Sequence, residues 1–91
     1  MGLVQDVHTA VTRYEDGARA ASLAVHDLAT TVAQLQEQLA VNGPLGASTD
    51  PDLARARARL TVAHQRLLAA AETVEASRRE ARAYADRAFP A

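Results

Sequence analysis

The sequence predicts an all-α protein, an antiparallel two-helix hairpin with coiled-coil-like packing. Apolar residues recur at alternating spacings of three and four over residues 4–39, and again every seven residues from 53 to 88. A segment with two Gly and one Pro separates the two periodic stretches. We therefore expect one domain over residues 1–91, with a helix over about 3–41, a loop over 42–50 and a helix over about 51–88.

The first predicted helix has the stronger pattern, which continues through five heptads. With Val4 at position a, we expect the a and d positions to form a coiled-coil seam that packs against the second helix. Within 3–41 only Gly17 weakens the helix, by about 1 kcal/mol relative to Ala. The a positions are Val4, Val11, Ala18, Val25, Val32 and Leu39, and the d positions are Val7, Tyr14, Ala21, Leu28 and Leu35.

The segment between the helices contains the residues that end one helix and begin the next. Asn42 or Gly43 is expected to adopt the left-handed conformation that terminates a helix, and Pro44 cannot continue it. Asp50 and Pro51 suit the N-cap and first helical position of the second helix. The short connection makes the two helices antiparallel neighbours.

The second predicted helix carries one row of mostly large residues and one of mostly small residues, which together predict the register of the hairpin. If facing residue numbers sum to about 91 or 92, each large d side chain of the first helix meets a small one. Small residues would then bring the helices closest near Ala21 and Ala70. The large row is Leu53, Leu60, Leu67, Val74, Ala81 and Ala88, and the small row is Ala56, Ala63, Ala70, Ser77 and Tyr84. The facing pairs include Leu28 with Ala63, Leu35 with Ala56 and Tyr14 with Ser77.

Composition and charge argue against several classes of function. The net charge of −1 gives no electrostatic basis for binding nucleic acid, although residues 1–42 carry −3 and residues 47–91 carry +2. No stretch approaches the roughly 18 apolar residues of a membrane span. The first residues lack the basic region of a conventional signal peptide. We expect a protein that is cytoplasmic, or secreted without a conventional signal peptide.

No residue pattern predicts catalysis, a cofactor or a metal. The chain has no Cys, and its three His residues are not spaced to converge on one helix face: they are His8, His26 and His64. No Ser lies in a nucleophile elbow, and no Lys completes a phosphate loop. We expect a protein that is not an enzyme and binds no cofactor.

A chain this short and rich in Ala buries little apolar surface by itself. We therefore expect a homodimer that forms a four-helix bundle, or a complex with a similar helical protein. Apolar residues outside the predicted seam are the candidates for this contact. The predicted interaction residues are Leu3, Leu23, Val62 and Leu68.

The hairpin resembles the WXG-motif family of small proteins exported by type VII secretion, which pair as helical hairpins into four-helix bundles. The family's Trp-x-Gly motif lies in the loop between its helices, where this chain has Pro44-Leu45-Gly46, so the Gly matches and the Trp does not. Tyr84 is placed like the Tyr of the family's Tyr-x-x-x-Asp/Glu export signal, but residue 88 is Ala. The resemblance implies a secretion substrate or the helical partner of one.

The expected function is a non-enzymatic helical interaction module, such as a small type VII secretion substrate or the partner of one. A cytoplasmic adaptor or scaffold hairpin is the alternative within the same class. A carrier with a ligand in the bundle core is the alternative from another class, and it requires polar side chains at a or d positions.

Overall fold

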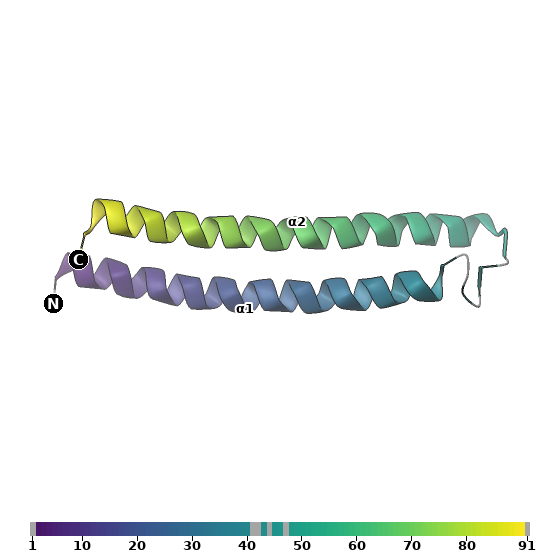
Figure 1. Cartoon of the computed structure of the whole chain (residues 1–91), viewed down its shortest axis with the longest axis horizontal. Coiled ribbons are helices and arrows are strands. Elements are labelled where there is room, and N and C mark those ends of the chain that lie inside the picture. Colours follow the sequence, from purple (N-terminus) through teal and green to yellow (C-terminus); the bar gives the residue numbers. More distant parts are fainter. Residues whose placement is uncertain (1, 41–42, 44, 47, 91) are drawn as a thin grey trace. The chain divides into compact units, whose positions relative to one another are not determined.

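The computed structural model describes residues 2–40, 43, 45–46 and 48–90, and it contains two helices and no strand within them. Helix α1 is Leu3–Gln38 and helix α2 is Pro51–Ala88. The chain reverses direction between the two helices (Figure 1). The predicted all-α, two-helix hairpin is confirmed.

The chain groups into two compact units. Unit 1 comprises Met1–Ala24 and Ala71–Ala91, and unit 2 comprises Val25–Ala70. In unit 1 the first part of α1 lies beside the last part of α2, and in unit 2 the loop joins the remaining parts of the two helices. Each unit therefore consists of one segment of α1 packed against one segment of α2.

Helix α1 ends at Gln38, three residues before the predicted end at 41, and residues 41 and 42 lie outside those described. The amide of Leu39 is shared between the carbonyls of Leu35 and Gln36, both at 3.2 Å, and that of Ala40 bonds to Glu37. The last turn is therefore tightened into a three-residue repeat, which often ends an α-helix. The guanidinium of Arg57 donates to the carbonyl of Leu39 and satisfies one of the carbonyls left free.

The left-handed residue expected at Asn42 or Gly43 is not Gly43, because none of the described glycines has a positive φ. A side chain at this position would be crowded by the end of α1. A Cβ there would lie 3.0 Å from the carbonyl oxygen of Glu37 and 3.2 Å from that of Ala40. The predictions for Asn42 and Pro44 fall outside the described residues.

Helix α2 begins as predicted. A carboxylate oxygen of Asp50 accepts a hydrogen bond from the amide of Asp52 at 2.7 Å, and Pro51 is the first helical residue. The amide of Ala54 closes the first helical turn onto the carbonyl of Asp50. Asp50 is therefore the N-cap, which satisfies an amide that the helix itself cannot.

The seam between the helices uses positions a and e of α1, so the predicted a/d seam is wrong. The d residues Tyr14, Leu28 and Leu35 are exposed, as is Ala21. Small or hydrogen-bonded side chains at e explain the difference, because they let α2 approach on that side of the a row. The buried residues of α1 are Ala18, Ser22, Ala29 and Val32, and those of α2 are Ala71 and Ala85.

The small residues that α2 packs against differ from those predicted. Ala21 and Ala70 are both exposed, whereas Ala18, Ser22 and Ala71 are buried in unit 1. A larger side chain should therefore overpack the helices at the buried positions Ala18, Ser22 and Ala71, and not at Ala21 or Ala70. The register agrees with the prediction at one pair, because the hydroxyls of Tyr14 and Ser77 are hydrogen-bonded to each other.

Candidate interaction surface

Helix α1 carries a second apolar row that α2 leaves largely exposed. Positions d and g of the same heptad frame follow each other at spacings of three and four, so they share one face of the helix. Every residue of this row except the half-buried Val7 is exposed. We call these residues the d/g stripe: Leu3, Val7, Ala10, Tyr14, Gly17, Ala21, Ala24, Leu28, Thr31, Leu35 and Gln38.

The d/g stripe contains large apolar side chains that are unusually open to solvent. Leu28 is 52% exposed and Leu35 is 42% exposed in unit 2, and Tyr14 is 45% exposed in unit 1. The hydroxyl of Thr31 bonds to the carbonyl of Asp27, so it does not require water. Single exposed leucines are ordinary, but a continuous row on one face is not.

Charge is excluded from this face of α1. All seven charged residues of the helix occupy positions b, c, e or f, and none occupies a, d or g. A helix with one partner needs a single apolar face, whereas α1 has the a row and the d/g stripe. This distribution is typical of a helix that packs against two other helices. The charged residues of α1 are Asp6, Arg13, Glu15, Asp16, Arg19, Asp27 and Glu37.

The four predicted interaction residues are exposed, but they do not form one patch. Leu3 belongs to the d/g stripe, whereas Leu23, in the same unit, lies at position f on a different face of α1. Val62 and Leu68 of α2 are six residues apart in unit 2, which places them about 120° apart around the helix axis. The structure therefore keeps Leu3 in a continuous surface and leaves the others dispersed.

Sequence reasoning missed Tyr14, Leu28 and Leu35 as surface residues because it assigned them to the internal seam. The a/d pattern alone is compatible with either side of the a row. The absence of charge from both d and g is the signal that distinguishes an apolar contact face from a solvated flank, because a solvated flank carries charged residues.

A chain of ion pairs holds the two helical segments of unit 1 together. The Glu15 carboxylate, 16% exposed, lies 2.5 Å from the Arg82 guanidinium and 3.8 Å from that of Arg78. Within α2, Arg78 also pairs with Glu75, and Arg82 also pairs with Asp86. The hydrogen bond from Arg82 and the positive charges nearby hold the pKa of Glu15 below its usual value, and the bond to Glu15 raises the pKa of Arg82.

His8 joins this network in a defined tautomer. Its Nε2 lies 2.6 Å from the carbonyl oxygen of Phe89, which can only accept, so Nε2 carries a hydrogen. Its Nδ1 lies 3.1 Å from a guanidinium nitrogen of Arg82, which can only donate, so Nδ1 accepts. His8 therefore links α1 to Arg82 of α2 and to Phe89, the residue that follows α2.

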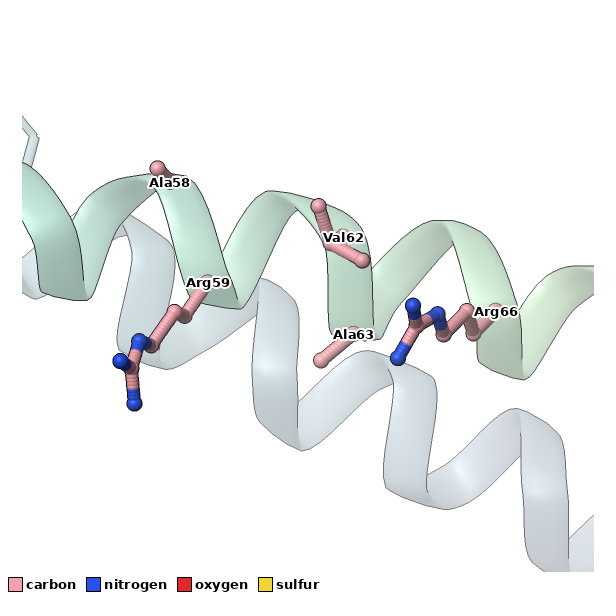
Figure 2. A pocket seen from close by; sticks show the side chains of 5 residues that line it. All are labelled: Ala58, Arg59, Val62, Ala63 and Arg66. Carbon is pink, nitrogen blue, oxygen red and sulfur yellow. The ribbon is translucent and has the colours of Figure 1, made fainter.

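A shallow depression of about 390 Å³ lies on α2 in unit 2 and is lined by Ala58, Arg59, Val62, Ala63 and Arg66. Figure 2 shows the side chains of Arg59 and Arg66 extending from the helix on either side of Ala63. All five of these lining residues belong to α2. It is a solvated helix face with two cations instead of an enclosed site.

The amount of exposed surface supports a further contact. The accessible surface of the chain is 6473 Å². Monomers of 9.7 kDa expose about 5100 Å² by the usual scaling with mass, so the excess is about 1400 Å². One partner in a standard protein interface buries about 800 Å². The core of the described residues contains four Ala, one Val and one Ser, so little large apolar surface is buried within the chain.

Within the described part of the chain, no group of three or more potential ligand side chains is arranged to hold a metal ion. The described helices also include none that is long and apolar enough to cross a membrane. No protein-family model matches the chain, and no curated protein or solved structure matches it either.

Proposed function

We propose that this chain is a non-enzymatic interaction module that binds another helical hairpin through the d/g stripe of α1. The observation that carries the proposal is the continuous uncharged row with exposed Tyr14, Leu28 and Leu35. Covering such a row removes apolar surface from water, worth about 25 cal/mol per Å² before the costs of association. A second helical layer would then complete a four-helix bundle.

Two finer roles use the same surface. A secretion substrate or partner of the type VII kind would present a hairpin of this form, and so would a cytoplasmic adaptor. Pro44 and Ala88 stand where the WXG-motif family has Trp and an acidic residue, so the interaction surface supports the module itself more directly than export. The ligand-carrier alternative has less support, because Ser22 is the one buried polar residue among those described.

The stripe can be tested with a matched pair of leucines on α1. Leu28 lies in the d/g stripe and is 52% exposed, and Leu23 lies off it and is 63% exposed. Neither position lies in the a/e seam, so neither substitution by Asp removes the contact between α1 and α2 directly. Multi-angle light scattering at micromolar concentration should show that Leu28→Asp dissociates the assembly to the 9.7 kDa chain and that Leu23→Asp does not.

The proposal would be contradicted by either of two results. If Leu28→Asp leaves the molar mass of the wild-type assembly unchanged, the d/g stripe is not the contact surface. If Leu23→Asp dissociates the assembly and Leu28→Asp does not, the contact lies on the face that contains position f. Circular dichroism should give Leu23→Asp the helicity of the wild-type assembly and Leu28→Asp the helicity of the diluted, dissociated wild-type chain.

A further inference from the structure

We propose that the partner on the d/g stripe is a second copy of this chain, with the two α1 helices antiparallel and facing residue numbers summing to 38. This inference rests on the proposed function and adds the identity of the partner and the register. It follows from how the sizes and charges along the stripe match when the stripe is paired with itself about a two-fold axis.

A two-fold axis imposes reciprocal pairing. If residue i of one copy faces residue j of its partner, then residue j also faces residue i, so the sum of the two numbers is constant along the contact. In an antiparallel pair whose core rows are d and g, each d residue faces a g residue. The sums that satisfy this condition differ by seven. The three registers that pair most of the stripe residues have sums of 31, 38 and 45.

The sum of 38 matches large side chains with small ones. Leu28 faces Ala10, Tyr14 faces Ala24, and Gly17 faces Ala21 near the axis. Small residues near the axis let the helices approach, and the large residues on either side fill the space opposite an Ala. This register also uses every stripe residue from 3 to 35, since Leu3 faces Leu35 and Val7 faces Thr31.

The residues beside the stripe distinguish the three registers. Position c precedes each d residue and flanks the contact, and facing c residues have numbers that sum to two more than the core pairs. For a core sum of 38, Arg13 lies beside Asp27 of the second copy, twice by symmetry, and both side chains are exposed in the chain alone. A core sum of 31 would place Asp6 beside Asp27, two like charges. A core sum of 45 would place Arg13 beside the uncharged Gln34.

Charge reversal tests the register. Arg13→Glu and Asp27→Arg each turn two attractions into two repulsions, so each should raise the dissociation constant of the assembly roughly tenfold. The double variant restores opposite charges and should return the constant to within about threefold of wild type. Asp16→Arg changes the same charge at position f, away from the stripe, and should leave the constant unchanged. Sedimentation equilibrium at low salt measures all four.

Spin labels give a second, independent readout, because the chain contains no cysteine. Ala20 and Gln34 both occupy exposed c positions. With 1.5 Å per residue, labels on Ala20→Cys should lie within about 20 Å of each other across the axis, and labels on Gln34→Cys about 40 Å apart. A parallel pair of α1 helices would give short distances at both positions, and a core sum of 45 would bring the Gln34 labels to about 30 Å.

The outcomes separate this inference from the proposed function. If Leu28→Asp dissociates the assembly but the double charge reversal fails to rescue the single ones, or the label distances disagree, the register is overturned and the d/g stripe remains the contact. If the chain alone is monomeric and forms a stripe-dependent complex with a different helical protein, the second copy is overturned as the partner. Rescue by the double variant together with the two label distances supports the inference.

Discussion

Small side chains at position e decide how α1 meets α2. Ser22 and Ala29 are buried there, whereas Leu28, one position before Ala29, is exposed. In the sequence, Leu and Tyr at d are the more conspicuous apolar residues, which is why they suggest the seam. Packing favours the opposite choice, since two helices approach most closely where their side chains are small. The large d residues are then left for another contact.

Glu15 provides a residue-level test of the interface within unit 1. Its pKa is lowered, chiefly by the hydrogen bond from Arg82, so its charged form stabilises the folded chain. This stabilisation is present above the ordinary glutamate value of 4.5 and is lost as pH falls below that value through the folded pKa. We predict that Glu15→Gln lowers the melting temperature at pH 7 and that the two melting curves converge as pH falls from about 5 to 3.

The control for this prediction is Glu72→Gln, which changes an exposed carboxyl of α2 by the same substitution. It should change the melting temperature far less at pH 7. A difference between wild type and Glu15→Gln that stays constant from pH 7 to pH 3 would contradict the role of the ionised carboxylate. Added salt should reduce the difference at pH 7, because part of the attraction is screened.

At the scale of the elements, the start of α2 was predictable from the sequence and the end of α1 was predictable only approximately. Asp50 and Pro51 form a local signal, in which one side chain satisfies one nearby amide. The end of α1 depends on Arg57, which comes from α2 and donates to the carbonyl of Leu39. A contact between residues 18 positions apart is not visible in a local sequence pattern.

The N-cap of α2 supplies the test at this scale. Replacing Asp50 with Ala removes the acceptor for the amide of Asp52 and should destabilise the chain by about 1 kcal/mol. Asp50→Asn keeps an acceptor at the same place and should have a much smaller effect. Urea unfolding of the two variants measures the difference. Equal loss of stability in both would indicate that the charge of Asp50, and not capping, stabilises the helix.

The difference between local signals and contacts between distant residues also explains which parts of the candidate surface could be predicted from the sequence. Helical periodicity and the hairpin follow from the spacing of apolar residues, and the pairing of Tyr14 with Ser77 follows from side-chain size. The choice between the two sides of the a row depends on how closely the helices approach, which the apolar pattern does not encode. The distribution of charge does encode it, since α1 keeps all its charges off positions d and g.

At the scale of the whole molecule, α1 has two apolar faces and, among the described residues, one helical partner. The a/e seam against α2 is built mainly from Ala, so it buries few large side chains. The d/g stripe contains four of the six large exposed apolar side chains of α1: Leu3, Tyr14, Leu28 and Leu35. A chain of this size has little margin of stability from its own core. Association through the stripe would therefore contribute to folding as well as to binding, and helicity should depend on concentration.

Sedimentation equilibrium of the unaltered chain, from about 1 to 100 μM, tests the central claim most directly. We predict a reversible assembly with twice the 9.7 kDa mass of the chain, which dissociates on dilution with a parallel loss of helicity measured by circular dichroism. A mass of 9.7 kDa throughout this range, with helicity independent of concentration, would show that the d/g stripe remains in contact with water and would contradict self-association through α1.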